Sequence, residues 1–204
     1  MKPYYEDDFC SIYHSDCREV LPSLQGAGVV TDPPYGVGAA EWDGAVPYDV
    51  LPMFLRLGGP VVWFGSSPHM VEDMETLRPE RVMVWAPRFR LGKVAANGIA
   101  YRFHPLYCWN LPKKHDGPVW DVLDEGTECG NWWVHPGTKP LRLMQRLVGL
   151  VDGTVVDPFM GSGTTLVAAK STGRRSIGIE VDEQYCEVAA RRLSQDVLDF
   201  GGVA

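Results

Sequence analysis

Several features that would place the chain among membrane, secreted or metal-dependent proteins are missing from its 204 residues. No apolar run approaches the roughly 20 residues that a membrane-spanning helix needs. Residues 1–8 contain no apolar segment of the kind found in a secretion signal. Because apolar residues make up 45% of the chain and charged residues 22%, we expect a globular cytoplasmic protein with a sizeable core and no membrane partner.

The placement of the cysteines argues against a zinc site or a disulfide framework. The five cysteines are scattered and odd in number, and the chain contains neither a Cys-x-x-Cys pair nor a His-Glu-x-x-His motif. We therefore expect no metal site and only buried or spare thiols. The sequence also has no internal repeat and no low-complexity tract, which leaves an ordinary folded domain.

Acidic residues outnumber basic ones, and the formal net charge of −7 by itself argues against a nucleic-acid ligand. The distribution of charge reverses that impression. Residues 81–115 contain seven of the 19 Lys and Arg residues and no Asp or Glu, whereas the remainder has twelve basic and 26 acidic residues. A basic segment on an acidic body can attract phosphates at one face. The same segment is also compatible with a solvated loop that lacks acidic residues.

Short apolar, β-branched runs alternate with helical patterns along most of the chain. Strands are predicted at residues 10–14, 29–32, 61–65, 82–86, 106–109, 154–157 and 176–180. Helices are predicted at residues 18–24, 48–57, 68–77, 140–151, 164–172 and 183–199. This alternation indicates a single α/β domain over residues 1–204, with a largely parallel sheet and helices on both faces. Residues 86–134 are rich in Gly, Pro, Trp and charge, and we expect them to form an insertion or long loops around one strand.

The most distinctive motif is Asp32-Pro33-Pro34-Tyr35, which directly follows an apolar run. The two prolines stiffen the turn and remove two N–H donors, so that carbonyl groups remain as the available backbone groups. A base amine is a poor nucleophile because its lone pair is delocalised into the ring. Acceptors on its two N–H bonds, supplied by the Asp32 carboxylate and the Pro33 carbonyl, would favour a reactive pyramidal nitrogen. Tyr35 could stack on a base extruded from a duplex. The alternative is a rigid strand-end turn with a capping Asp.

A second motif spans residues 155–165, which are predicted as a strand, a Gly-rich turn and a helix. Its glycines, Gly161 and Gly163, let the backbone approach a ligand closely at a helix N-terminus. The motif is neither Gly-x-Gly-x-x-Gly, because Leu166 stands at the last position, nor a phosphate loop. A nucleotide-like ligand without phosphates therefore fits better. Glu180 ends a strand about 20 residues later and could accept hydrogen bonds from two ribose hydroxyls, although an acid at a strand end is also common without such a role.

Together these motifs resemble those of the N6-adenine and N4-cytosine DNA methyltransferases. The order is that of the β-type, in which the Asp-Pro-Pro-Tyr motif precedes the glycine-containing cofactor motif. Residues 13–17 resemble the N-terminal element of the family, with Asp16 near the cofactor adenine. Residues 135–140, His-Pro-Gly-Thr-Lys-Pro, resemble its His-Pro-Thr-x-Lys-Pro element, with Gly in the usual place of Thr. The resemblance covers residues 9–85 and 100–195.

The resemblance implies a Rossmann-like, seven-stranded methyltransferase fold in circularly permuted order, with S-adenosylmethionine as cofactor. The catalytic residues would be Asp32, Pro33, Pro34 and Tyr35. The cofactor-binding residues would be Asp16, Asp32, Thr138, Lys139, Asp157, Phe159, Gly161, Ser162, Gly163, Thr164, Glu180 and Val181. The methyl group would pass directly from sulfonium to nitrogen by in-line displacement, because no cysteine has the Pro-Cys context that cytosine-C5 enzymes need. Catalysis would then rest on orientation and electrostatics.

Target recognition in this family often lies between the catalytic and the cofactor halves, where residues 86–134 stand in this chain. The residues expected to contact DNA phosphates are Arg88, Arg90, Lys93, Arg102, Lys113 and Lys114. Trp120, Trp132 and Trp133 could stack on bases, although core packing is the preferred interpretation. The short region favours a short or loosely defined recognition sequence. The resemblance also allows a homodimer, and a cognate restriction nuclease in a restriction-modification system.

Several alternatives stay open on the sequence alone. Asp at position 32 favours adenine N6 as the target, because Ser is commoner there in cytosine-N4 enzymes, but cytosine N4 is not excluded. Methyltransferases of RNA or of protein amides more often carry Asn in place of Asp32 and usually have the cofactor motif first. A nucleic-acid-binding protein could keep the fold without the chemistry, although the intact motifs at residues 32–35 and 161–163 argue against it.

Overall fold

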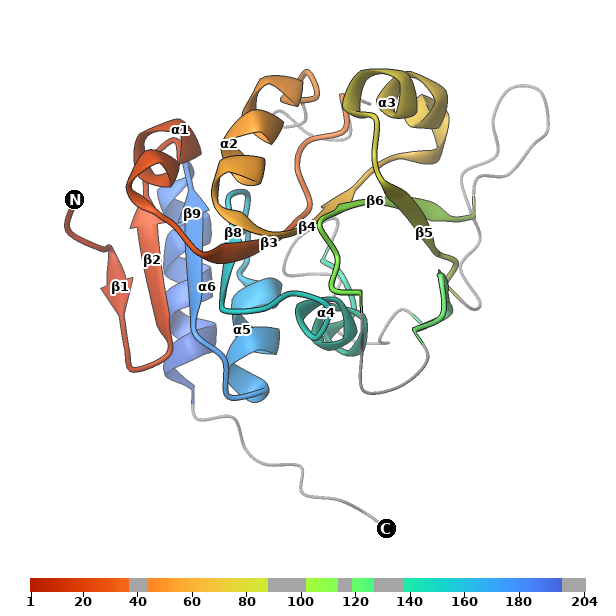
Figure 1. Ribbon diagram of the computed structural model, residues 1–204. Helices are drawn as coiled ribbons and strands as arrows, with labels where there is room; N and C mark the ends of the chain where they lie inside the picture. The colour runs from red at the N-terminus through yellow and green to blue at the C-terminus, as the bar shows by residue number, and fades with distance from the viewer. Residues whose placement is uncertain (37–43, 88–101, 114–118, 127–137, 196–204) are drawn as a thin grey trace, which may run out of the picture.

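One mixed sheet runs through the computed structural model, which describes residues 1–36, 44–87, 102–113, 119–126 and 138–195 (Figure 1). Within these residues the sheet has nine strands in the order β1-β2-β9-β8-β3-β4-β6-β5-β7. The strands are β1 (Tyr5–Glu6), β2 (Cys10–His14), β3 (Ala27–Thr31), β4 (Gly58–Phe64), β5 (Arg81–Trp85), β6 (His104–Trp109), β7 (Val122–Leu123), β8 (Thr154–Asp157) and β9 (Ser176–Glu180). Neighbouring strands from β2 to β4 are parallel, whereas β1 and β6 run antiparallel to their neighbours.

All seven predicted strands are present, and β2, β8 and β9 have the predicted bounds. The sheet is largely parallel as expected, and among the seven predicted strands β6 is antiparallel to its neighbours β4 and β5. The short strands β1 and β7 were not predicted, because two residues are too few to carry an alternating pattern. Both lie at the ends of the described sheet, so they extend the seven-stranded core without changing its order.

The six predicted helices are also present in the described residues. They are α1 (Cys17–Val20), α2 (Leu51–Arg56), α3 (Met70–Leu77), α4 (Leu141–Val148), α5 (Thr164–Ser171) and α6 (Glu183–Ser194). Three of the predicted helices include a short 3-10 turn, at η1 (Leu21–Ser23), η2 (Tyr48–Val50) and η3 (Ser67–His69). The predicted continuation of the last helix over residues 196–199 lies outside the described residues.

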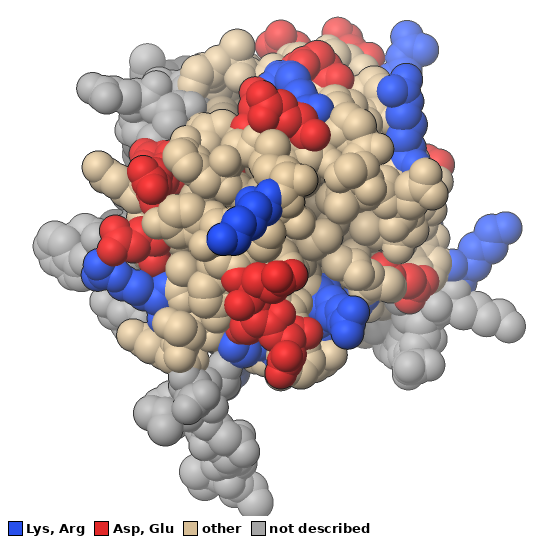
Figure 2. Space-filling view, turned by 90° about the vertical axis from the view of Figure 1, so that its left-hand side faces the viewer, with Lys and Arg blue, Asp and Glu red and all other residues tan. Residues whose placement is uncertain are grey.

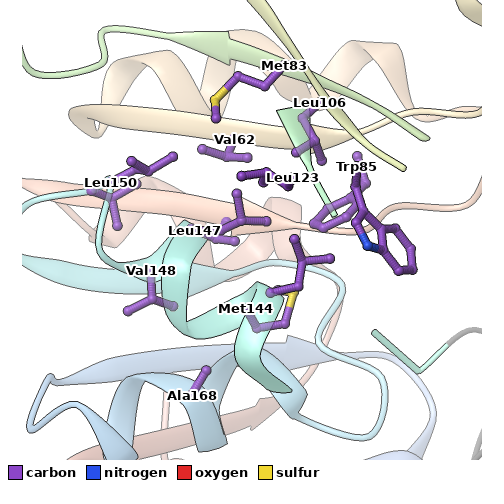
Figure 3. Close-up of a cluster of buried hydrophobic side chains, with 14 of the residues drawn as sticks. Val62, Met83, Trp85, Leu106, Leu123, Met144, Leu147, Val148, Leu150 and Ala168 are labelled. Atoms are coloured by element: carbon purple, nitrogen blue, oxygen red, sulfur yellow. The ribbon is translucent and has the colours of Figure 1, made fainter. Parts of the chain in front are cut away.

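The helices cover both faces of the sheet, as predicted. In Figure 1, α1, α2 and α3 lie on one face and α4, α5 and α6 on the other. Val29 and Val61 belong to the core under α1 and α2, whereas their neighbours Val30 and Val62 belong to the core under α4 and α5. Figure 3 shows the second core, where side chains of α4 such as Leu147 meet those of the sheet. Because the central strands are buried on both sides, they are apolar throughout rather than alternating.

The topology creates a switch point between β3 and β8, which are adjacent and parallel. From β3 the chain passes through α2 to β4 on one side, and from β8 it passes through α5 to β9 on the other. Ligands of open α/β sheets bind at such a point, outside the carboxyl ends of the strands. The two strongest sequence motifs meet here, because Asp32 follows β3 and the Gly-rich turn follows β8.

The described parts of the chain also bear on the sequence expectations for membrane helices, metal sites and cysteines. None of the described helices combines the length and the apolarity that crossing a bilayer requires. Among the same residues, no group of three or more His, Cys, Asp or Glu side chains is arranged to hold a metal ion. Four of the five cysteines are described, and all four are buried and free, as expected for core thiols.

Candidate active site

Four acidic residues follow the carboxyl ends of four neighbouring parallel strands. Asp16 comes two residues after β2, Glu180 ends β9, Asp157 ends β8, and Asp32 directly follows β3. These strands are adjacent in the order β2-β9-β8-β3, so the four acids lie along one edge of the sheet. With a strand spacing of about 4.8 Å, the row from Asp16 to Asp32 spans roughly 14 Å. Its length suits an elongated ligand that lies across the strand ends.

The Asp32 carboxylate is held by two protein donors. The Lys139 ammonium forms an ion pair with Oδ2, and the Tyr35 hydroxyl donates a hydrogen bond to Oδ1. Only 8% of the Lys139 side chain is exposed, whereas 26% of the Asp32 side chain is exposed. The carboxylate is therefore partly open to solvent. It can accept further hydrogen bonds, because each of its oxygens has two lone pairs.

Aromatic rings surround this ion pair. The Lys139 nitrogen lies 5.6 Å from the centroid of the Tyr35 ring and 5.1 Å from that of Phe64. The Tyr35 ring lies 6.4 Å from the ring of His104, which in turn stacks on Trp85 at 5.0 Å. Aromatic faces beside an acceptor carboxylate suit a planar base that carries an amino group.

Asp157 connects the two motifs behind the strand ends. Its Oδ1 accepts hydrogen bonds from the Thr31 hydroxyl at 2.8 Å and from the Phe159 amide at 3.1 Å, and its Oδ2 accepts one from the Thr165 hydroxyl. Burial raises the pKa of Asp157 to about 6. The carboxylate thus ties the end of β3 to the start of α5. The resemblance implies that Asp157 contributes to cofactor binding, and with these hydrogen bonds it would do so by fixing the Gly-rich turn.

The Gly-rich turn requires its glycines for conformation and for space. Gly161 and Gly163 have φ values of +50° and +77°, in the left-handed region that favours glycine. A Cβ atom on Gly163 would lie 2.8 Å from the Cβ of Ala189 in α6. The Gly161 amide donates to the Glu180 carboxylate at 2.9 Å, which joins the turn to the end of β9. The turn therefore presents backbone rather than side chains to the strand ends.

Arg192 of α6 was not predicted as a site residue, yet it holds the same turn. Its guanidinium donates to the carbonyl and the hydroxyl of Ser162 and to the Thr164 hydroxyl. The side chains of Ser162 and Thr164 are buried. Their predicted role in cofactor binding would therefore depend on the backbone of the turn. Sequence reasoning missed Arg192 because it lies 30 residues from Ser162 on an otherwise ordinary helix.

Glu180 is mostly buried at the end of β9, and burial raises its pKa. Its two oxygens accept hydrogen bonds from the amides of Gly161 and Asp182 at 2.9 and 3.0 Å, which fixes the direction of the carboxylate. Val181 follows with 65% of its surface exposed. An oriented acceptor next to an exposed apolar side chain suits a ligand that combines hydroxyl groups with a planar ring.

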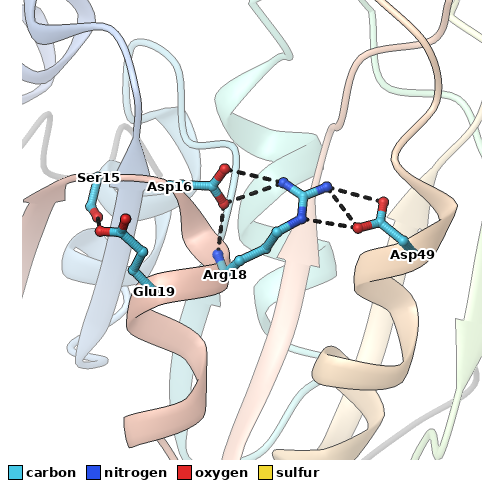
Figure 4. Close-up of polar contacts among 5 residues, drawn as sticks. All are labelled: Ser15, Asp16, Arg18, Glu19 and Asp49. Carbon is cyan, nitrogen blue, oxygen red and sulfur yellow. Dashed lines mark hydrogen bonds and ion pairs between the residues drawn. The ribbon is translucent and has the colours of Figure 1, made fainter.

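Asp16 is bound to residues that the sequence did not single out. It caps α1 by accepting from the Arg18 amide at 2.8 Å, and the Arg18 guanidinium bridges it to Asp49 of η2 (Figure 4). The Ser15 amide donates to the Glu180 carbonyl at 3.0 Å, so the Asp16 turn lies beside the end of β9. Asp16, expected near the cofactor adenine, and Glu180, expected near its ribose, thus lie at adjacent strand ends.

The His-Pro-Gly-Thr-Lys-Pro element is described only from Thr138 onward, and residues 135–137 lie outside the described residues. Pro140 occupies the N-cap position of α4. Lys139, immediately before it, reaches Asp32 across 107 residues of sequence. The resemblance predicts a cofactor contact for Lys139, whereas in this structure its ammonium is paired with the carboxylate of the Asp-Pro-Pro-Tyr motif.

The basic residues predicted to contact DNA are only partly described, because Arg88, Arg90, Lys93 and Lys114 lie outside the described residues. β6 is antiparallel to β4, so its first residues lie at the carboxyl ends of the parallel strands. Arg102, just before β6, is therefore at the same end of the strands as Asp32, whereas Lys113, after β6, is at the opposite end. Trp120 is 68% exposed, so core packing was the wrong expectation for this tryptophan. Figure 2 shows the face on the left of Figure 1, where acidic and basic side chains are interspersed over a mostly uncharged surface.

Comparison with known proteins identifies the family. Residues 73–191, more than half of the chain, match the family model N6_N4_Mtase, described as DNA methylase. The chain belongs to the DNA methylase family. Among relatives of this DNA methylase, YubD of Escherichia coli K12 is 42% identical over 211 residues, which cover 88% of each chain. The Type II methyltransferase M.ScaI of Streptomyces caespitosus is 24% identical over 96% of this chain and 84% of its own.

Solved structures agree with the fold of this DNA methylase. The cytosine-N4-specific PvuII DNA methyltransferase has a TM-score of 0.73 at 18% identity, covering 97% of this chain and 90% of its own. The complex of M1.HpyAVI with S-adenosylmethionine has a TM-score of 0.68 at 23% identity, covering 90% and 99%. The methyltransferase fold and the family that the motifs predicted are therefore confirmed.

Proposed function

We propose that this DNA methylase transfers the methyl group of S-adenosylmethionine to an exocyclic amino nitrogen of DNA, with adenine N6 as the target. The observation that carries the proposal is the meeting of two motifs at the switch point. The Asp32 turn follows β3, the Gly-rich turn follows β8, and Asp157 is hydrogen-bonded to both through Thr31 and Thr165. An acceptor for an amine and a backbone cradle for a cofactor thus share one edge of the sheet.

The residues along the strand ends fit S-adenosylmethionine chemically. When bound, this cofactor supplies an electrophilic methyl group on a cationic sulfonium. Glu180 offers an oriented carboxylate for the two ribose hydroxyls, and Asp16 lies at the next strand end, on the side where the adenine would be. Gly161 and Gly163 leave room for close approach of the ligand to the backbone. The acidic row also complements the positive charge of the sulfonium.

On the substrate side, Asp32 and Pro33 supply acceptors and Tyr35 supplies a stacking face for an extruded base. Acceptors on both N–H bonds keep the amine pyramidal and aim its lone pair. None of the five cysteines follows a proline, as the nucleophile of cytosine-C5 enzymes does, and among the described residues burial raises the pKa of Cys17, Cys108 and Cys186 to about 12, which makes these three thiols poor nucleophiles. The protein therefore accelerates the reaction by orienting the two reactants and by electrostatic complementarity.

Adenine is the preferred target because an Asp begins the catalytic motif. The E. coli relative YhdJ, named a DNA adenine methyltransferase, is 36% identical over 98 residues, which cover 47% of this chain. Cytosine N4 is the second candidate, favoured by the high structural similarity to the PvuII enzyme. The relatives named Type II methyltransferases support a role in restriction-modification, and with it a partner nuclease. A cytoplasmic location, a homodimer, and a DNA surface that includes Arg102 belong to the same proposal.

The test is transfer of a labelled methyl group from S-adenosylmethionine to unmethylated DNA and, in a separate reaction, to RNA, followed by mass spectrometry of the nucleosides. We expect N6-methyladenine; N4-methylcytosine would select the second candidate, and label in RNA alone would refute DNA as the substrate. Asp32→Ala should abolish transfer while cofactor affinity stays within about tenfold. Asp8→Ala removes an exposed acid between β1 and β2 and should leave transfer unchanged. Equal activity of the two variants would refute the role of Asp32.

A further inference from the structure

The environment of Lys139 is unusual for a residue that would only contact a cofactor. Its side chain is buried, its ammonium lies on Oδ2 of Asp32, and the Tyr35 hydroxyl occupies Oδ1. Both oxygens of the carboxylate that would receive the target amine therefore already have a donor. One of these donors is itself an amine nitrogen, with three N–H groups.

We propose that Lys139 is the resting counter-ion of Asp32, stands in the place of the target amino group, and gives way when the base enters. The inference rests on the proposed function, because it assumes that Asp32 receives the substrate amine. Lys139 is then a positioning residue that acts through Asp32. It differs from the cofactor contact that the family resemblance implies for the same residue.

Charge is the physical reason why the pair has to loosen. Because the Lys139 ammonium is buried, leaving it unpaired would carry a large cost, so its pairing with Asp32 is favourable while no substrate is bound. During methyl transfer the same small region must hold a cationic sulfonium and a nitrogen that becomes positive. A third cation raises the energy of both. Asp32 therefore complements the reacting groups fully only after Lys139 has moved away from it.

The aromatic rings give the displaced ammonium a second partner. Its nitrogen already lies 5.1 Å from the Phe64 ring and 5.6 Å from the Tyr35 ring. These distances are within the range of cation–π attraction. A short movement away from Asp32 can therefore keep the ammonium against the Phe64 face while the Tyr35 face turns to the base.

The test compares the affinities for S-adenosylmethionine and S-adenosylhomocysteine, which differ in the methyl group and in the positive charge on sulfur. Lys139→Met removes a competing cation near the sulfonium. We expect about three- to tenfold tighter binding of S-adenosylmethionine by calorimetry, with little change for the uncharged S-adenosylhomocysteine. Lys139→Arg keeps the charge and should keep the wild-type ratio of the two affinities. In an Asp32→Asn background the Lys139 ammonium has lost its counter-ion, so Lys139→Met should favour S-adenosylmethionine over S-adenosylhomocysteine at least as strongly as it does in the wild type.

The outcomes separate this inference from the proposed function. Weaker binding of both ligands in Lys139→Met would overturn the inference and favour a direct cofactor contact. An equal change for both ligands would indicate a structural role and also overturn it. Lys139→Gln provides a second neutral variant that can still donate to Asp32, in case Lys139→Met does not fold. Methyl transfer to DNA by the wild type tests the proposed function independently. Absence of this transfer would refute the proposed function, whereas the ratio of the two ligand affinities would still decide whether Lys139 acts as the counter-ion of Asp32.

Discussion

Gly163→Ala should destabilise the protein by about 2–4 kcal/mol, because the residue is constrained in two ways. Its φ of +77° lies in the left-handed region, where a Cβ costs about 1 kcal/mol. The new methyl group would also lie 2.8 Å from the Ala189 Cβ. Relieving such overpacking costs about 1–3 kcal/mol through shifts of α5 and α6. Because Gly163 caps α5 within the Gly-rich turn, the shift should also move the backbone that faces the cofactor.

Gly173→Ala is the matched control for this prediction. Gly173 has a similar φ of +70°, but no atom lies within 4 Å of the position that its Cβ would take. Urea denaturation should therefore show a loss of only about 1 kcal/mol for Gly173→Ala. Calorimetry should show weaker S-adenosylmethionine binding for Gly163→Ala alone. Equal losses of stability would refute the packing argument, and equal cofactor affinities would place the cofactor away from this turn.

Three further predictions follow from the site. Burial raises the Asp157 pKa from 3.8 to about 6. Between these pH values the folded state binds the proton and the unfolded state does not, so the contribution of this group to the free energy of unfolding falls as pH rises through the interval. Asp157→Asn should remove this component from urea denaturation curves, and identical pH profiles of the two proteins would contradict the assignment. Arg192→Met removes the hydrogen bonds that hold the Gly-rich turn and should weaken S-adenosylmethionine binding about three- to tenfold. Arg191→Met loses only an exposed ion pair and should leave the affinity unchanged. Equal affinities of the two variants by calorimetry would show that Arg192 does not support the cofactor site. Arg102→Glu should reduce DNA affinity and the slope of its salt dependence more than Lys113→Glu, and the reverse order would move the DNA surface to the other edge of the sheet.

The family and the main strands could be predicted because their signals are local. An apolar β-branched run followed by Asp32-Pro33-Pro34-Tyr35 contains both its strand and its turn within about ten residues, and so does the run that leads to Gly161. Helix boundaries were less exact, because 3-10 turns such as η2 have the same apolar positions as the helices they precede. The edge strands β1 and β7 could not be predicted, because each has only two residues and is defined by its pairing with a neighbouring strand rather than by its own sequence pattern.

The sequence by itself determined the chemistry of the strand ends, because turn residues such as Pro33 and Gly163 restrict the backbone wherever the chain folds. Only the tertiary structure decided which of these ends are neighbours. The ion pair between Asp32 and Lys139 joins residues far apart in the sequence, and so does the contact between Arg192 and the Gly-rich turn. Such pairings depend on strand order and on the faces that the helices cover, and neither is encoded in a short stretch of sequence.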